Sequence, residues 1–289
     1  MTTTIPTPIR LQLGHAAVQV VADRIGADVL HIKGESLDPT VRRSGRTASD
    51  VDVLVHPDHV GALLVALRAA GWELLNDFPS SSAFEHSATL RHPAWGYLDV
   101  HRSFPGFTVP ADAAFGVLWS AGRTWLAAGR ACRVPEPTAQ RLVLLLHAAR
   151  SRGSHRGRQD ITHTWTAADD GVRAAVEELA RRLGAEVGLA AATGRLDAWR
   201  GHPDHDLWQI ASAGGTRIDE WRARVKAAPT ARGKLRLVGR AALVNVEHLA
   251  MLRGRPPTRR EVVAEFFARP VRGVREELAR RRGPHRSGG

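Results

Sequence analysis

The chain has 289 residues, of which 43% are hydrophobic and 24% are charged. The chain is long enough for two domains of ordinary size and apolar enough to bury a core in each, which excludes a disordered or fibrous protein. The only cysteine, Cys132, cannot form an internal disulfide, and the first residues lack the basic flank and apolar stretch of a secretory signal. No uncharged apolar run approaches the ~20 residues that cross a bilayer. We therefore expect a cytoplasmic protein without a membrane segment.

The formal net charge is +12, and only three of the basic residues are lysines. Arginine in place of lysine is typical of GC-rich coding. Codon bias does not explain the surplus of basic over acidic residues. The charge favours an acidic partner, which could be a nucleotide, a nucleic acid or a smaller anion.

Short strand-like and helical segments alternate over the first third of the chain. Residues 11–25 carry apolar side chains at helical spacing, and residues 58–71 form a second amphipathic pattern that begins at Asp58 and closes at Gly71. Strands are expected at residues 29–32, 51–55, 72–75, 84–90 and 97–101. The pattern predicts a small mixed α/β domain over residues 1–110.

After about Pro110 the composition changes to alanine, leucine and arginine in helical periodicity. Helices are expected at residues 138–149, 172–183, 216–227, 231–252 and 258–268. Thr258 and Glu261 form a capping-box pattern at the start of the last of these. We predict an all-α helical domain over residues 111–270 and a basic C-terminal tail over residues 271–289. The fold class is therefore α+β, with a small mixed-sheet domain followed by a helical one.

The chemistry is concentrated in three acidic residues on expected strands. Asp50 and Asp52 alternate with valines, so both carboxylates project from one face of a strand, ~7 Å apart at ~3.3 Å per residue. Asp99 stands in the same way between Leu98 and Val100. If the two strands are neighbours, three carboxylates converge. Such a set can hold two divalent cations for an in-line phosphoryl or nucleotidyl displacement.

An Asp-x-Asp pattern also occurs in proteins with different chemistry. The pattern alone is weak, because acids often occupy the wet end of a strand. Haloacid-dehalogenase-like phosphatases and metal-dependent glycosyltransferases place these acids after an apolar strand, whereas here the polar residues from Arg46 to Ser49 come first and the apolar run follows. A Walker-type phosphate loop is absent.

Four motifs together resemble the bacterial nucleotidyltransferases of the polymerase-β-like superfamily. They are the apolar strand ending in Lys33-Gly34, the run from Arg46 to Val55, the helix ending in Gly71-Trp72, and the segment from Leu98 to His101. The resemblance is in particular to an uncharacterised nucleotidyltransferase family with Lys-Gly and Asp-x-Asp motifs, and more distantly to AbiEii-type toxin nucleotidyltransferases. The family's fold would be a nucleotidyltransferase-like catalytic domain followed by helices.

The resemblance implies roles for the three acids. Asp50 and Asp52 would ligate two Mg²⁺ ions. Asp99 would ligate the catalytic ion and help to deprotonate the acceptor hydroxyl.

The resemblance also implies a phosphate-binding set. Gly34 would let the backbone approach the triphosphate, and Lys33, Arg46 and Ser49 would contact phosphates. Many members of the superfamily have Gly-Ser or Gly-Gly at this turn, whereas Glu35 follows Gly34 here.

The implied activity is Mg²⁺-dependent transfer of a nucleoside monophosphate from an NTP to a hydroxyl acceptor, with release of pyrophosphate. The acceptor is left open among tRNA or another RNA, a small molecule and a protein, and so is the oligomeric state. The alternative is a non-catalytic nucleotide- or RNA-binding module that keeps the fold. A further group of basic residues is interpreted as a solvated loop, with triphosphate or RNA binding as the alternative. These residues are Arg150, Arg152, Arg156 and Arg158.

Overall fold

The computed structural model describes residues 5–78, 86–151, 153–215 and 217–227, and the single residues 230, 258, 260 and 261. The chain divides into two compact units, Met1–Ala213 and Gly214–Gly289. In the second unit, helix α10 (Arg217–Ala227) lies at the predicted position. The predicted capping box forms, because the Thr258 N–H donates to the Glu261 carboxylate at 2.7 Å. The predicted helix at 231–252 and the tail at 271–289 lie outside the described residues.

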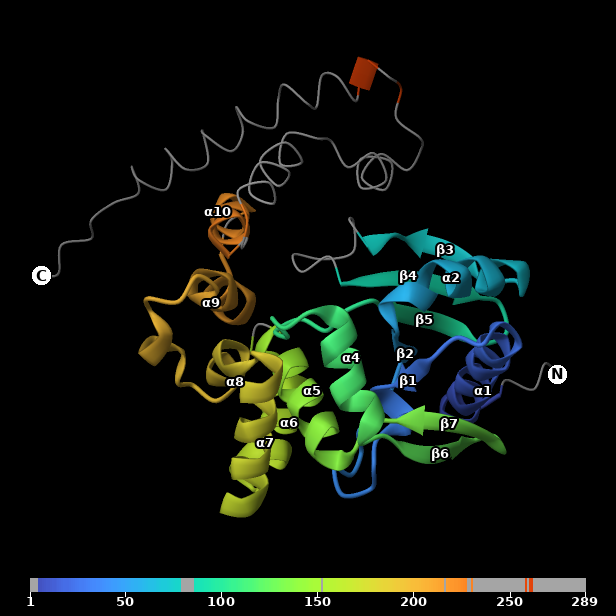
Figure 1. Ribbon diagram of the computed structural model, residues 1–289, viewed down its shortest axis with the longest axis horizontal. Helices are drawn as coiled ribbons and strands as arrows, with labels where there is room; N and C mark the ends of the chain where they lie inside the picture. Colours follow the sequence, from blue (N-terminus) through green and yellow to red (C-terminus); the bar gives the residue numbers. More distant parts are fainter. Residues whose placement is uncertain are drawn as a thin grey trace, which may run out of the picture. The chain divides into compact units, whose positions relative to one another are not determined.

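A five-stranded mixed sheet forms the centre of the first unit, in the order β1-β2-β5-β4-β3 (Figure 1). Its strands are β1 (Val29–His31), β2 (Asp50–Val55), β3 (Glu73–Asn76), β4 (Ser87–His92) and β5 (Gly96–His101). The strands β2 and β5 are parallel, and the other neighbours are antiparallel. The condition for convergence of the carboxylates is therefore met, because β5 lies directly beside β2.

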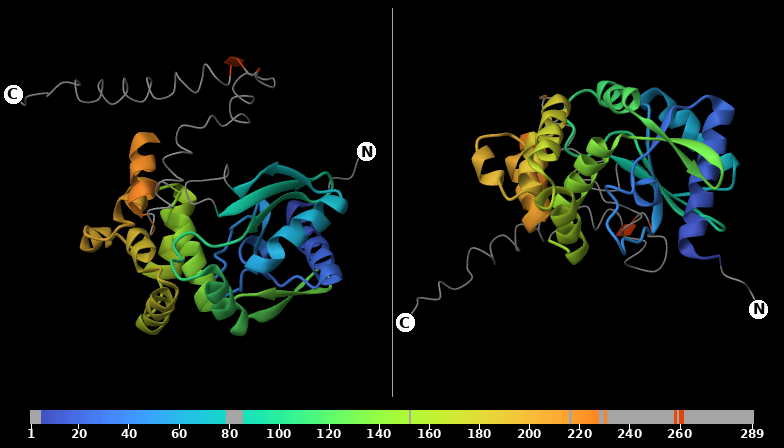
Figure 2. Two further views of the ribbon diagram at one scale, coloured as in Figure 1. Left: turned by 45° about the horizontal axis from the view of Figure 1, so that its top comes forward. Right: turned by 90° about the horizontal axis from the view of Figure 1, so that it is seen from below.

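The alternation along β2 separates two cores. Val51 and Val53 are fully buried against helices α1 (Thr7–Ile25) and α2 (Val60–Ala69). Each such valine stabilises the fold by roughly 1.5–3 kcal/mol relative to an exposed one. Leu54 points the other way and joins a second core formed mainly by later helices. In Figure 2 the blue helices α1 and α2 are grouped together, apart from the yellow-green helices. Asp50 and Asp52 share the Leu54 face.

The region after Pro110 departs from the all-α expectation at one hairpin. Helix α4 (Ala111–Ser120) is followed by the antiparallel strands β6 (Arg123–Ala127) and β7 (Arg130–Val134). Ala128 and Gly129 connect them, with φ of 46° and 83°. Two consecutive positive φ values are typical of the tight hairpin turns that match strand twist. The α+β class is confirmed, and the boundaries at residues 110 and 270 stay predictions.

The remaining helices of the first unit surround α5 (Pro137–Ala149), whose Leu142 and Leu145 are fully buried. They are α6 (His155–Ile161), a π-helical turn (Thr162–Thr166), α7 (Asp170–Leu183), α8 (Glu186–Ala192) and α9 (His205–Ala213). The ends of α7 follow the usual chemistry, because the Asp169 side chain accepts from the Val172 N–H and Gly184 is left-handed at φ 64°. Within the described residues, no helix combines the length and apolar character needed to cross a membrane.

Candidate active site

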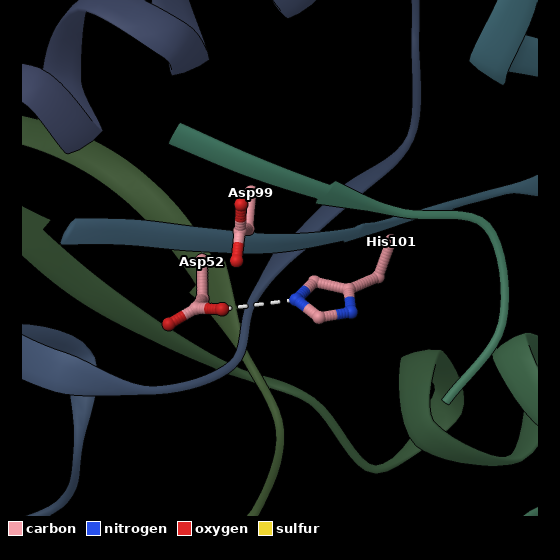
Figure 3. Close-up of side chains that lie close together, drawn as sticks. All are labelled: Asp52, Asp99 and His101. Atoms are coloured by element: carbon pink, nitrogen blue, oxygen red, sulfur yellow. Dashed lines mark hydrogen bonds and ion pairs between the residues drawn. The ribbon is translucent and has the colours of Figure 1, made fainter. Parts of the chain in front are cut away.

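The three acids lie on the two central parallel strands. Asp52 is directly opposite Asp99 in the ladder, and Asp50 is opposite Tyr97. Asp52 is 3% exposed, whereas Asp50 and Asp99 are partly exposed. Figure 3 shows the carboxylates of Asp52 and Asp99 close to each other, with the His101 ring turned toward Asp52. The structure therefore brings Asp52 and Asp99 together as the sequence predicts.

Two neighbours fix the buried carboxylate of Asp52. Lys33 Nζ lies 2.7 Å from Asp52 Oδ1, and His101 Nε2 donates to the same oxygen at 2.9 Å. Burial alone would raise the pKa of Asp52, but the Lys33 charge and the His101 hydrogen bond outweigh burial and hold this pKa well below its usual range. Asp52 is thus ionised, and its carboxylate is held in one orientation by Lys33 and His101.

The other two carboxylates are held less tightly. Burial, followed by the charge of Asp52, raises the pKa of Asp99 to about 6, although the Thr89 hydroxyl donates to it at 2.7 Å. Burial and the charge of Asp52 also raise the pKa of Asp50, whose Oδ1 accepts from the Ser49 hydroxyl at 2.9 Å. The contribution of the Asp52 charge to both pKa values shows that like charges repel there, in addition to the larger effect of burial. A bound cation would relieve that repulsion.

A metal ion fits this donor set. Asp52, Asp99 and His101 offer ligand atoms that all lie within 4.8 Å of one another. Carboxylate oxygens suit Mg²⁺ or Mn²⁺, and an imidazole suits softer ions. Because His101 Nε2 is already bonded to Asp52, we take the carboxylates as ligands and His101 as the group that orients Asp52. Asp50 is not one of the three, so a second ion would rely on Asp50 and substrate oxygens.

The Lys-Gly turn lies beside the acids. Gly34 has φ +70°, and a Cβ there would lie 3.1 Å from the Ala48 Cβ, so the turn requires glycine. A single helical turn, Gly34–Ser36, follows it, and the Ser36 hydroxyl donates to the Lys33 carbonyl at 2.8 Å. These contacts place Lys33 against Asp52.

The other two expected phosphate contacts differ from each other. Ser49 lies next to Asp50 through its hydrogen bond. Arg46 is paired with buried Asp160 of α6 at 3.3 Å, and its side chain is 8% exposed. Its Nε therefore contacts a buried carboxylate of α6.

The C-terminal end of α5 supplies Arg150, for which the sequence offered phosphate binding only as an alternative, and His147, to which it assigned no role. Arg150 caps α5, and its guanidinium lies 3.4 Å from His86 Nε2 and over the Phe104 ring. Burial lowers the pKa of Arg150 to about 10. The charge of Lys33, followed by burial, holds the pKa of His147 well below its usual range.

The sequence signals for these residues were partial. His101 alternates with Asp99 and so had to share its face, and His147 and Arg150 are three residues apart on one helix face. The interpretation of a solvated basic loop is wrong for Arg150, which is mostly buried. Arg156 and Arg158 lie on α6, and Arg152 is outside the described residues.

A comparison with models of protein families identifies the family of this chain. A family model described as "Uncharacterised nucleotidyltransferase" matches residues 26–201. The chain belongs to this family. The match covers the Lys-Gly turn, all three acids and α5, and confirms the nucleotidyltransferase family that the motifs resembled. The protein is therefore a nucleotidyltransferase enzyme.

Several solved structures are similar to this protein. The lincosamide antibiotic adenylyltransferase LnuA, bound to lincomycin, is 16% identical, with a TM-score of 0.38, over 54% of this chain and 96% of its own. An antigenic nucleotidyltransferase-like protein from Paracoccidioides brasiliensis is 13% identical, with a TM-score of 0.39, over 64% and 92%. The antibiotic-resistance factor ANT(2'')-Ia is 14% identical, with a TM-score of 0.38, over 68% and 97%. No curated protein sequence matches significantly.

Proposed function

We propose that this nucleotidyltransferase moves a nucleoside monophosphate from an NTP to a hydroxyl acceptor in a reaction that depends on two Mg²⁺ ions held by Asp50, Asp52 and Asp99. The observation that carries the proposal is the adjacency of Asp52 and Asp99 on parallel strands, with their ligand atoms within 4.8 Å of each other. Bound Mg²⁺ would neutralise charge on the attacking and leaving oxygens.

The nucleotide side of the site is formed by Lys33, Gly34 and Ser49. Lys33 brings a cation to the edge of the acidic group. The Gly34 turn leaves the backbone free of a side chain where a triphosphate would approach. Arg46 was also expected here, but it supports the position of the loop through Asp160. Any contact between Arg46 and a phosphate would use guanidinium N–H groups other than Nε.

The acceptor side is assigned to Asp99. It is more accessible than Asp52, and it accepts a hydrogen bond from the neutral Thr89 hydroxyl. The acceptor oxygen forms a bond to the α-phosphorus as the bond from that phosphorus to pyrophosphate breaks. The hydroxyl proton passes to Asp99 and then to water. We leave the acceptor open among RNA, a small molecule and a protein.

The helices contribute to the binding of the anionic substrate. Arg150, at the end of α5, contacts His86 just before β4, and the His86 ring centroid lies 5.1 Å from that of His101, which bonds to Asp52. Lys33 and Arg150 thus bring two cationic side chains to the surroundings of the carboxylates. This arrangement supports a polyphosphate as ligand, since a buried arginine binds phosphate through several N–H donors.

The test is label transfer from each α-labelled NTP in cell lysate with Mg²⁺. The product is separated into RNA, protein and small-molecule fractions. We expect transfer by the wild type and a loss of at least about a hundredfold, ~2.7 kcal/mol of activation free energy, in Asp50→Asn/Asp52→Asn. Asp112→Asn, on the exposed face of α4, is the matched control.

The outcomes separate the two functional classes. Label transfer that survives the double substitution would refute the catalytic proposal. RNA retention that weakens with salt, without any label transfer, would support the non-catalytic binding module instead.

A further inference from the structure

An open cavity of about 650 Å³ is lined by the loop of residues 35–46, the hairpin β6–β7 and the start of α5. Its volume lies within the range of about 300–1,000 Å³ that is usual for small-molecule sites. The residues that decide its chemistry are Glu35, Arg42, Arg43, Arg46, Arg123 and Trp125. Of these residues, the proposed function considers only Arg46.

The cavity is separate from the three acids. Its aromatic wall, Trp125, packs edge-on against His15 of α1, with ring centroids 5.2 Å apart. His15 in turn contacts His31, whose ladder partner is Val53, and Val53 faces α1. Asp52 precedes Val53 and therefore projects from the opposite face of the sheet. The cavity thus lies at the free edge of β1, behind the Lys-Gly loop.

Two buried carboxylates hold the arginines of the loop in place. Glu35, which is 6% exposed, contacts both terminal nitrogens of Arg42 at 2.8 Å. Asp160, which is 3% exposed, lies 3.4 Å from Arg43 Nε and 3.3 Å from Arg46 Nε. Arginine donors that are already fixed lose little conformational entropy when an anion binds. The loop is therefore a preorganised anion-binding surface.

The balance of charge and shape identifies the class of ligand. Four arginines line the cavity against two acids, Glu35 and Asp38. The net charge of these groups stays positive even when Asp160, which pairs with two of the arginines, is included. Trp125 is partly exposed and offers a flat wall, and Leu37 and Pro39 add apolar surface. Guanidinium groups bind phosphate or carboxylate, and an indole ring stacks on planar rings.

We infer that this cavity binds a small planar anion of the nucleoside monophosphate class, without a metal ion. The phosphate lies among Arg42, Arg43 and Arg123, and the base lies against Trp125. The same chemistry occurs in a free nucleotide and in the 5′-phosphorylated end of an oligonucleotide.

The experiment is calorimetric titration of the full chain with AMP in EDTA, which removes divalent cations from the acidic site. We expect saturable binding that weakens at least about tenfold, ~1.4 kcal/mol, in Arg123→Gln and in Trp125→Leu. Arg68→Gln, an exposed arginine on α2, is the matched control and should bind like the wild type. Arg123 is itself exposed, so Arg123→Gln tests the cavity even if Trp125→Leu fails to fold.

Further arms separate this cavity from the proposed reaction site. AMP binding should persist in Asp50→Asn/Asp52→Asn, whatever that variant does to label transfer. Adenosine should bind at least about tenfold more weakly than AMP. Competition by a 5′-phosphorylated tetranucleotide would assign the ligand to an RNA end, and its failure to compete would assign it to a free nucleotide.

Three results would overturn the inference. The first is the absence of AMP binding to the wild type at millimolar concentration. The second is AMP binding that is unchanged in both Arg123→Gln and Trp125→Leu. The third is AMP binding that is lost in Asp50→Asn/Asp52→Asn, because this would place the ligand at the acids.

Discussion

The pair formed by Lys33 and Asp52 allows a quantitative test of how the acidic site is held. Both side chains are less than a tenth exposed, and Nζ lies 2.7 Å from Oδ1. Lys33→Met keeps the length of the side chain but leaves the buried carboxylate to depend on its hydrogen bond from His101. Removing one partner of a buried ion pair typically costs about 3–5 kcal/mol. We expect that loss in the free energy of unfolding, measured by urea denaturation in EDTA.

A double-mutant cycle isolates the interaction. In Lys33→Met/Asp52→Asn the charge is removed from both positions, so most of the loss should be recovered, with a coupling of about 2–4 kcal/mol. Added Mg²⁺ should stabilise Lys33→Met more than the double variant, since the free carboxylate gains a cation. The exposed pair Glu178–Arg181 is the control, and Arg181→Met should have a far smaller effect. Additive single substitutions would refute the reasoning that Lys33 is required to keep Asp52 ionised.

Three further predictions concern other parts of the molecule. Burial lowers the pKa of His15 to about 4 and also lowers that of its partner His31, so the unfolded chain binds more protons below pH ~6.5. The free energy of unfolding, measured by urea denaturation at a series of pH values, should therefore fall as the pH drops from ~6.5 toward 4. In His15→Asn this dependence on pH should be weaker. Arg150→Gln should raise the KM for NTP at least about tenfold with a smaller change in kcat, and Arg150→Lys should recover part of the lost affinity. A KM in Arg150→Gln equal to that of the wild type would show that Arg150 does not bind the substrate. Ala128→Gly should raise the midpoint of thermal unfolding by relieving the positive φ of 46°, a gain of about 1 kcal/mol; an unchanged or lower midpoint would contradict it.

The sequence predicted those features that depend on local alternation. The pattern of acids and valines in β2 fixed which side chains share a face, and Asp99 followed by the same rule. The helix α5 and most strands of the sheet lie within a residue of the predicted positions, whereas β4 begins three residues later than expected, at Ser87. The Lys-Gly turn was also readable, because a left-handed residue beside a close neighbour requires glycine.

The features that were missed depend on contacts between distant segments. The adjacency of β2 and β5 could be stated only as a condition, since strand order follows from packing of the whole sheet. The hairpin at 123–134 is rich in arginine and alanine and pairs because its turn fits and Cys132 is buried, which propensity does not reveal. Likewise, the burial of Arg150 beside His86 joins residues far apart in sequence.

The Lys-Gly loop is fastened to the helices at several points. Gln140 of α5 accepts from the Asp38 N–H at 2.7 Å, Arg141 donates to the Thr40 carbonyl at 2.9 Å, and Asp160 pairs with Arg46. Leu30 and Leu54 of the sheet also belong to the core of the helices. A fragment that ended near residue 110 would expose this apolar surface and release the loop. A chimera that receives the acidic strands would therefore also need the helices, because the same contacts hold the Lys-Gly loop and stabilise the fold.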